Sequence, residues 1–365
     1  MLRTVILNII RFVVGGLFIF SGLIKVNDPV GTAIKLEEYF DVFSSDIAFF
    51  FEYFKAISLP LAVFLVVVEV ALGVMVILGW KIRTVIYLLL AMIVFFTFLT
   101  FYSAYFDKVT DCGCFGDAIK LTPWESFYKD IVLLVLILIL FYFRHQIREN
   151  SSRWAMWGSL LAFSLAIVLS VAAIRNLPFI DFRAYKKGVN IQEAMQPSAP
   201  LQYSYLMEKD DEVFVFDQYP ADDSYEFVEM RLNNPESLPK ISDFSVWNEE
   251  GDFTDEVLSG KKILILISNV EKMSHKSLDK IGNLERAFRG TDVEVKLVGA
   301  SSDDELKRVL LENGWDISYY LADATVVKTI IRSNPGLVFL QDGTVKAKFH
   351  HLNTPEPDRA KKIFE

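Results

Sequence analysis

The sequence predicts an α-helical membrane bundle, made of four helices plus a fifth linking span, followed by a soluble α/β domain. Hydrophobic residues make up 52% of the 365 residues, and 31 of them are Phe, which is too apolar for an ordinary soluble enzyme. Charge is divided unevenly, because residues 1–177 hold 14 Lys or Arg and 13 Asp or Glu, whereas residues 178–365 hold 23 and 33. Patterns typical of strands and helices alternate only in the second part, so one half is lipid-soluble and the other is an acidic soluble domain.

Five apolar runs are long enough to cross a bilayer, which takes about 20 residues at about 1.5 Å rise per residue. The fourth is short and needs its lead-in from Trp124, which requires that Lys129 snorkels and that Asp130 faces protein. No small-residue cleavage site follows the first run, so we expect a retained anchor. The five runs cover residues 5–24, 57–78, 84–105, 131–143 and 154–174.

The basic residues of the short loops predict the orientation of these spans. They all fall on one side, which the positive-inside rule assigns to the cytoplasm, whereas the opposite loops are acidic or mixed. We therefore expect a bacterial inner-membrane protein with a cytoplasmic N-terminus and a periplasmic C-terminal domain, on the side where a disulfide persists. The basic residues are Arg3, Lys81, Arg83, Arg144, Arg148 and Arg153.

The chain has only two cysteines, Cys112 and Cys114, in a short polar loop between the third and fourth runs. An extended Cys-x-Cys segment separates its outer Cα atoms by about 6.6–7 Å, at or beyond the usual disulfide range of about 4.4–6.8 Å. The loop must therefore bend, and Gly113 and Gly116 supply the backbone freedom. A bridge closed in so small a ring is expected to be labile.

Three interpretations of this pair stay open. In thiol–disulfide exchange, one cysteine attacks or is attacked and its neighbour resolves the mixed disulfide, which makes Cys112 and Cys114 the catalytic residues. In the second interpretation, the pair is a local staple that shapes the loop. The third is a metal site, which is disfavoured because two thiolates do not complete a tetrahedral zinc site and no histidine lies nearby.

Glu69 is the one carboxylate deep in an apolar run, and Arg11 in the first run is a candidate partner. It either accepts a proton during thiol oxidation or belongs to a buried pair that aligns two helices. All four histidines lie outside the runs, which excludes a bis-histidine haem within the bundle. We therefore expect no bound cofactor, and a diffusible quinone or another protein as a possible electron acceptor.

The soluble half is predicted element by element from its periodicity and turn residues. In the membrane half, an amphipathic segment at residues 30–43, after the first run, is expected to lie on the outer membrane surface. Short strands are predicted at 201–207, 213–216, 225–232, 263–267, 293–300 and 317–321, helices at 274–288, 303–313 and 324–332, and a hairpin at 337–349 around Asp342-Gly343.

Two stretches of the membrane half resemble the DoxX and MauE superfamily of redox-associated membrane proteins. They are residues 20–31, with Phe20-Ser21-Gly22-Leu23-Ile24-Lys25 followed by Asp28-Pro29-Val30-Gly31, and the Cys112-Gly113-Cys114-Phe115-Gly116 loop. The resemblance covers about residues 1–145 and implies a four-helix membrane domain. For the MauE branch it also implies an association with disulfide formation in exported proteins.

The soluble domain resembles the thioredoxin-like fold of the TlpA and peroxiredoxin type. Asp243-Phe244-Ser245-Val246 and Asn334-Pro335-Gly336 match its order, which places Pro335 where that family usually has a cis-proline. Residues 268–274 stand where a redox-active member has Cys-x-x-Cys, and they contain no sulfur nucleophile. The resemblance thus implies a thioredoxin-like domain at 241–365 that docks partners, after a linking span at 146–177 and a periplasmic linker with short strands at 178–240.

These features lead to a leading hypothesis and two rivals. The leading one is an inner-membrane thiol–disulfide oxidoreductase that acts through its Cys-x-Cys pair on exported or membrane-tethered thiol proteins. The first rival is a non-enzymatic scaffold or assembly subunit of an envelope complex, and the second is a quinone-linked respiratory subunit. The lipid bilayer is a partner in each case. No nucleic-acid partner is expected, because that would require clustered Lys and Arg.

Overall fold

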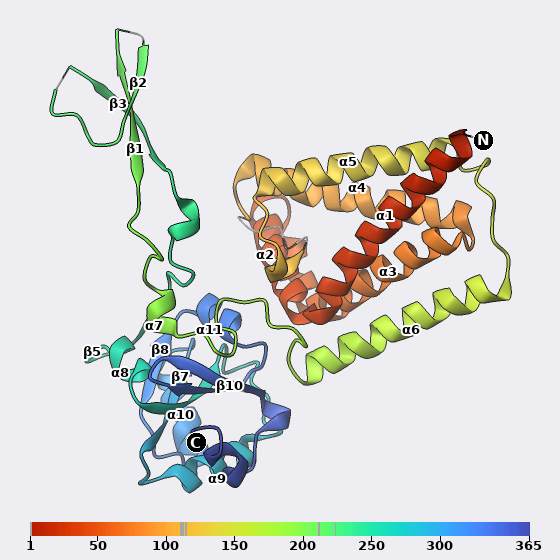
Figure 1. The fold of residues 1–365 in the computed structure, drawn as a ribbon. Helices are drawn as coiled ribbons and strands as arrows, with labels where there is room; N and C mark the ends of the chain where they lie inside the picture. The colour runs from red at the N-terminus through yellow and green to blue at the C-terminus, as the bar shows by residue number, and fades with distance from the viewer. Residues whose placement is uncertain (1, 110–112, 114, 211, 223) are drawn as a thin grey trace. The chain divides into compact units, whose positions relative to one another are not determined.

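The computed structural model describes residues 2–109, 113, 115–210, 212–222 and 224–365. The chain divides into two compact units, Met1–Phe182 and Arg183–Glu365, which differ in secondary structure (Figure 1). The first unit is helical and the second is α/β.

The helical unit consists of long α-helices joined by short connections. Three of the helices begin at well-formed N-caps, because the Asp28, Thr122 and Ser152 side chains accept hydrogen bonds from backbone N–H groups of the first turn. The elements are α1 Leu2–Asn27, α2 Pro29–Asp46, the 3-10 helix η1 Phe49–Ile57, α3 Ser58–Leu78, α4 Ile82–Phe106, the 3-10 helix η2 Gly116–Ala118, α5 Pro123–Tyr142 and α6 Arg153–Arg175.

Four helical segments of the described chain are long and apolar enough to cross a membrane: Leu2–Asn27, Phe49–Leu78, Ile82–Phe106 and Arg153–Arg175. This confirms the membrane helical half of the expected fold. α5 is 20 residues long, but its first half carries Glu125, Lys129 and Asp130, so length and composition alone do not mark it as a span. Asp130 is 1% exposed and therefore faces protein, as the sequence predicts.

The helices pack in pairs, α1 with α3, α4 with α5, and α3 with α6. Gly15 and Gly73 bring α1 and α3 close together, because a β-carbon on Gly15 would lie 2.8 Å from the Gly73 carbonyl oxygen.

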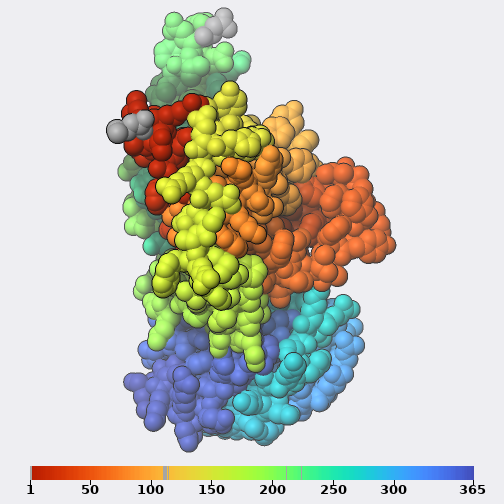
Figure 2. Space-filling view, turned by 90° about the vertical axis from the view of Figure 1, so that its right-hand side faces the viewer, coloured from red at the N-terminus to blue at the C-terminus, as the bar shows by residue number. Residues whose placement is uncertain are grey.

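The stretch around η1 projects from one side of the unit (Figure 2), and its Phe49 and Tyr53 side chains are 70% and 72% exposed. The buried face of α6 uses small side chains, namely Ala155, Ser159, Ala166, Ser170 and Ala173.

The second unit contains a seven-stranded mixed sheet with strand order β10-β9-β6-β7-β8-β4-β5. β6 pairs in parallel with β7 and antiparallel with β9. The strands are β4 Val246–Asn248, β5 Gly251–Asp252, β6 Lys261–Ile267, β7 Val293–Gly299, β8 Tyr319–Ala322, β9 Gly336–Gln341 and β10 Thr344–His350. The helices are α7 Ile191–Ala194, α8 Thr254–Leu258, α9 Leu278–Phe288, α10 Asp303–Asn313, α11 Ala324–Ile330 and α12 Pro357–Lys361, with 3-10 turns η3 Pro235–Ser237 and η4 His351–Asn353.

One face of this sheet forms the main core of the unit. Ile263, Ile265 and Ile267 of β6 point to that face at every second residue, where α9, α10 and α12 cover them. An α/β domain with a mixed sheet is the second half of the fold class that the sequence predicts, and it is confirmed. The predicted helix at 303–313 has the bounds of α10, because Ser302 and Glu305 form a capping box and Gly314 ends the helix in the left-handed conformation.

A separate three-stranded antiparallel sheet, with strand order β2-β1-β3, occupies residues 203–232. Its strands are β1 Tyr203–Lys209, β2 Glu212–Phe216 and β3 Glu226–Leu232. They confirm the three short strands that the alternation of apolar and polar residues predicts.

Candidate functional site

The loop between α4 and α5 carries the cysteine motif. Cys112 and Cys114 lie outside the described residues, so the structure describes the motif through Gly113, Phe115 and Gly116. Gly113 has a φ of 63° and Gly116 a φ of 49°, values that glycine adopts without the steric cost a β-carbon brings. The Gly116 N–H donates a hydrogen bond to the Gly113 carbonyl oxygen at 3.1 Å. Both glycines thus have positive φ angles, which allow the loop to bend at these two positions.

The residues on either side of position 114 pack against three helices. The Phe115 ring lies 5.6 Å from the Phe20 ring of α1, centroid to centroid. The Lys129 ammonium of α5 lies 5.1 Å from the centroid of the Phe115 ring. A β-carbon placed on Gly113 would lie 3.2 Å from Cγ of Lys35 on α2. Two lysine side chains therefore border the residues that flank position 114.

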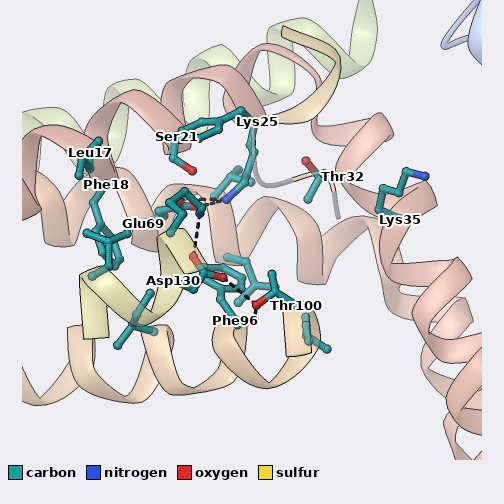
Figure 3. A pocket seen from close by; sticks show the side chains of 18 of the residues that line it. Leu17, Phe18, Ser21, Lys25, Thr32, Lys35, Glu69, Phe96, Thr100 and Asp130 are labelled. Carbon is teal, nitrogen blue, oxygen red and sulfur yellow. Dashed lines mark hydrogen bonds and ion pairs between the residues drawn. The ribbon is translucent and has the colours of Figure 1, made fainter. Parts of the chain in front are cut away.

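Gly113 and Phe115 also line a cavity of about 80 Å³ inside the helical unit (Figure 3). One water needs roughly 10–15 Å³ by this measure, so the cavity has room for several water molecules. Its walls are mainly apolar, and they include Leu17, Phe18, Leu36, Leu65, Val66, Ile93, Phe96, Leu99 and Leu133.

Two ion pairs, one buried and one partly exposed at its lysine, interrupt these apolar walls. The Lys25 ammonium of α1 donates to both carboxylate oxygens of Glu69 on α3, at 3.0 and 2.8 Å, and the two side chains are 9% and 5% exposed. On the α5 side, Lys129 pairs with Asp130 at 2.7 Å, and the Thr100 hydroxyl donates to Asp130 at 3.1 Å. Each carboxylate thus faces a cation, which offsets much of the cost of removing both charges from water.

The expected Arg11–Glu69 pair is not formed. α1 and α3 pack side by side with Arg11 near the end of α3, where its guanidinium donates to the carbonyl oxygens of Val76 and Ile77 at 3.0–3.2 Å. Those carbonyls belong to the last helical turn and have no partner within the helix. Lys25 is 14 residues further along α1, about 21 Å away at 1.5 Å per residue, and this places it at the level of Glu69.

Sequence reasoning missed Lys25 and Thr100 as members of the site. Lys25 follows the first apolar run directly, so it resembles an ordinary interfacial lysine. Thr100 lies in the apolar run of α4 and carries no charge to single it out. Lys25 and Thr100 line the same cavity as Gly113 and Phe115 of the cysteine loop. This follows from the packing of the helices and not from the sequence.

The α/β unit contains the second region that the sequence singles out. The peptide bond between Asn334 and Pro335 is cis, directly before β9. The Asn334 side chain accepts a hydrogen bond from the Ser268 N–H at 3.1 Å and donates one to the Asn269 carbonyl oxygen at 2.6 Å. The proline turn is therefore tied to the segment that follows β6.

Two histidines pack beside this turn. His350 and His351 are 6% and 8% exposed, and their ring centroids are 4.2 Å apart. Burial lowers the pKa of His350 to about 4 and also lowers the pKa of His351. The Ser333 hydroxyl lies 3.1 Å from Nδ1 of His351 and accepts a hydrogen bond from its backbone N–H. Ser333 therefore links the proline turn to the end of β10.

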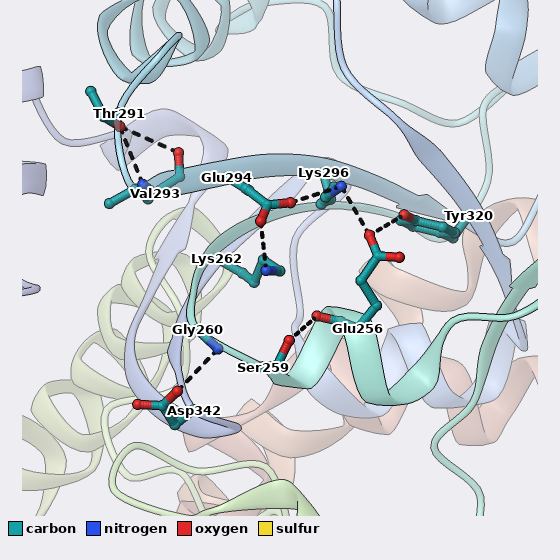
Figure 4. Close-up of polar contacts among 10 residues, drawn as sticks. All are labelled: Glu256, Ser259, Gly260, Lys262, Thr291, Val293, Glu294, Lys296, Tyr320 and Asp342. Atoms are coloured by element: carbon teal, nitrogen blue, oxygen red, sulfur yellow. Dashed lines mark hydrogen bonds and ion pairs between the residues drawn. The ribbon is translucent and has the colours of Figure 1, made fainter.

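A polar network stabilises one side of the seven-stranded sheet (Figure 4). Glu294 accepts hydrogen bonds from Lys262 at 3.0 Å and Lys296 at 2.9 Å, and Glu256 accepts from Lys296 at 3.2 Å and from Tyr320 at 2.9 Å. Burial by itself lowers the pKa of Lys296, but the two carboxylates outweigh it and raise the pKa. The network holds α8 on the sheet, so we assign it a structural role.

Over the described parts of the chain, no group of three or more His, Cys, Asp or Glu residues is placed to hold a metal ion.

Comparison with known proteins agrees with the membrane half of this description. The family model of the methylamine utilisation protein MauE matches residues 3–143, which include the four helices α1, α3, α4 and α5. Protein TlpB of Flavobacterium psychrophilum is 27% identical over 173 residues, which cover 46% of this chain and 45% of that protein. The match thus spans less than half the length of this curated relative. No solved structure matched the chain. Residues 3–143, which hold the ion pairs and the cysteine loop, are therefore similar to the MauE family of membrane proteins.

Proposed function

We propose that this protein carries out thiol–disulfide exchange through Cys112 and Cys114 at the outer face of a bacterial inner membrane. Its partners are exported or membrane-tethered proteins that carry thiols. The helical unit holds the reactive loop, and the C-terminal unit docks the partner.

The exchange conserves atoms and electrons at each step. A thiolate of the reduced partner attacks one sulfur of the Cys112–Cys114 disulfide, which breaks that bond and forms a mixed disulfide. The second thiolate of the partner then attacks the mixed disulfide, so the partner leaves oxidised and the loop keeps two thiols. A protein disulfide reoxidises the loop by the same two steps in reverse. Two electrons move in each round, and no metal or other oxidant is needed.

The observation that carries the proposal is the set of residues that surround the cysteine loop. Gly113 and Phe115, which flank position 114, line a cavity whose walls also include three lysines, Lys25, Lys35 and Lys129, and two carboxylates, Glu69 and Asp130. Cations near a cysteine favour the thiolate, which is the reactive form. A staple that only shapes a loop has no need of a buried, charged cavity beneath it.

We further propose that the C-terminal unit is thioredoxin-like. The strand order β7-β6-β9-β10, with β6 and β7 parallel and β9 and β10 antiparallel, supports this. Residues 268–274 contain no cysteine, so this unit serves to bind a partner rather than to react with it. The proposed domains keep the boundaries 1–145, 146–177, 178–240 and 241–365.

Mixed-disulfide trapping tests the exchange. Cys112→Ser and Cys114→Ser each leave one thiol without its resolving neighbour, so at least one variant should accumulate a covalent adduct with an envelope protein. The adduct is detected after acid quenching and alkylation, as a band that disappears on reduction. The double variant Cys112→Ser/Cys114→Ser is the matched control and should form no adduct.

The proposal fails if neither single variant forms an adduct and both support partner oxidation at the wild-type level. In that case the second candidate, a membrane scaffold or assembly subunit, stands in its place. The observation in favour of that candidate is that the C-terminal unit contains no cysteine and so has no thiol of its own.

A further inference from the structure

The three-stranded sheet of residues 203–232 exposes apolar side chains to an unusual degree. Val213 and Val215 on β2 are 56% and 65% exposed, and Phe227 and Met230 on β3 are 55% and 50% exposed. A small sheet is stable on its own only if it has three or more strands with an apolar face, or packs against a helix. Exposed apolar patches on a soluble unit commonly mark interaction sites.

The pairing register places two rows of side chains on one face. Val213 of β2 lies opposite Glu208 of β1, which in turn lies opposite Glu226 of β3. The neighbouring row is Val215, Leu206 and Glu229 in the same strand order. Strands are about 4.8 Å apart, so this face is apolar along β2 and acidic along β3 within about 10 Å. We call these six residues the glutamate-rimmed face.

The charges of this face are not balanced within the described chain. Glu208 and Glu226 are directly opposite, a like-charge arrangement that destabilises a sheet, and neither forms an ion pair with a described residue. Glu229 pairs with Arg231 at 3.2 Å, with both side chains more than half exposed. Residues 203–232 contain nine Asp or Glu and only two Lys or Arg.

We propose that the glutamate-rimmed face binds another polypeptide through a segment that carries apolar side chains and Lys or Arg side by side on one surface. The apolar side chains would cover Val213 and Val215, and the cations would pair with Glu208 and Glu226. A second copy of this chain fits poorly, because two such acidic sheets repel each other. An anionic membrane surface fits poorly for the same reason. This proposal goes beyond thiol exchange, since it needs neither cysteine.

Peptide binding to the full-length protein in detergent micelles tests the proposal. The probe is a fluorescent ten-residue peptide in which every second residue is Ser and the residues between are Val and Lys by turns, so that Val and Lys share one face of the extended chain. Its partner probe has Glu in place of every Lys. We expect the Val-Lys peptide to bind and to be weakened by added salt, and the Val-Glu peptide not to bind. The Cys112→Ser/Cys114→Ser variant should bind the Val-Lys peptide as the wild type does, which separates this test from that of the proposed function.

Matched variants locate the binding. Glu208→Gln/Glu226→Gln should weaken Val-Lys binding about tenfold, because the variant removes two charge-assisted contacts with the peptide. It also removes the repulsion between the two carboxylates in the free protein, which binding of a cation would otherwise relieve. Val213→Ser/Val215→Ser should weaken it similarly. The controls are Glu312→Gln and Leu311→Ser on α10, where Leu311 is 82% exposed, and these should leave binding unchanged.

The proposal is wrong if the wild type does not bind the Val-Lys peptide, or if the face variants bind it as tightly as the α10 controls do. It is also wrong if the full-length protein self-associates and the Val213→Ser/Val215→Ser variant abolishes that association, because the occupant would then be a second copy.

Discussion

Lys25 and Glu69 form the most buried ion pair of the helical unit, and they come from two different helices. Removing two charges from water is costly, and the pair repays the cost only while both partners are present. The pair therefore makes the alignment of α1 and α3 depend on two single residues. Its position beside the cysteine loop gives it a second role in the proposed exchange, as a fixed electrostatic environment.

Neutralising one partner of this pair should be worse than removing both. Glu69→Gln leaves the Lys25 ammonium buried without its carboxylate and should destabilise the protein by on the order of 3–5 kcal/mol. Lys25→Met/Glu69→Leu removes both charges and should recover most of this loss. Thermal unfolding in detergent measures the difference. Equal stability of the single and double variants would show that the pair does not couple the helices.

His350 should make the stability of the α/β unit depend on pH. Burial lowers its folded-state pKa to about 4, whereas the unfolded chain has a pKa of about 6.5. The unfolded state therefore binds the extra proton first, so the free energy of unfolding falls as pH drops from about 6.5 to 4, by at most about 3 kcal/mol. His351, whose pKa is lowered in the same direction, adds to this slope.

Denaturant unfolding of the wild type and of His350→Gln between pH 4 and pH 7 measures that slope. The variant should lose most of it. His275→Gln, which changes an exposed histidine of the same unit, should keep the wild-type slope. A His350→Gln profile as steep as that of the wild type would assign the pH dependence to other groups.

At the scale of elements, the contact between α1 and α3 depends on glycine. A β-carbon on Gly15 would clash with Cγ1 of Ile77 and would lie 2.8 Å from the Gly73 carbonyl oxygen, whereas one on Gly16 would meet nothing within 4 Å. The two neighbouring glycines thus face different surroundings. Close approach through small residues is a common way for membrane helices to associate.

Gly15→Leu should therefore separate α1 from α3, and Gly16→Leu should not. The first variant is expected to lower the yield of folded protein and its midpoint of thermal unfolding in detergent, because the side chain meets the backbone of α3. The second adds an apolar side chain to an open surface and should behave as the wild type does. A similar loss in both variants would mean that helix flexibility, rather than contact, is the function of these glycines.

At the scale of the whole molecule, α5 decides on which side of the membrane the α/β unit lies. Its 20 residues extend about 30 Å, the thickness of a bilayer core, but its charged first half weakens the signal from composition. Lys129 and Asp130 neutralise each other and Asp130 is buried, which lowers the cost of placing this helix in lipid. We therefore expect α5 to span.

Reporter fusions measure this expectation. A fusion within residues 146–152, between α5 and α6, should report the cytoplasm, and a fusion after Phe349 should report the outer side. If α5 does not span, both assignments reverse. A membrane-impermeant thiol reagent applied to whole cells tests the orientation of the first three spans instead, because Cys112 and Cys114 precede α5 and should react from outside after reduction whether or not α5 spans.

Much of this organisation follows from the order of residues alone. Long apolar runs identify α1, α3, α4 and α6, and shorter apolar or alternating segments identify β1–β3 and β6–β10, because periodicity records which face of an element is buried. The short strands β4 and β5 were not predicted. Turn and cap residues such as Gly314 and Asp342-Gly343 mark where elements end. The charge difference between the two halves is likewise a property of composition.

Contacts between distant residues could not be obtained in this way. The partner of Glu69 is Lys25 rather than Arg11 because helix packing, and not sequence spacing, sets which residues share a level. The cross-strand position of Glu208 opposite Glu226 depends on strand register in the same way. The sequence by itself thus determined the elements, the two halves and the cysteine pair, since these depend on local patterns. Only the tertiary structure decided which charges meet around the cavity and which side chains form the exposed face, since these depend on how separate elements pack.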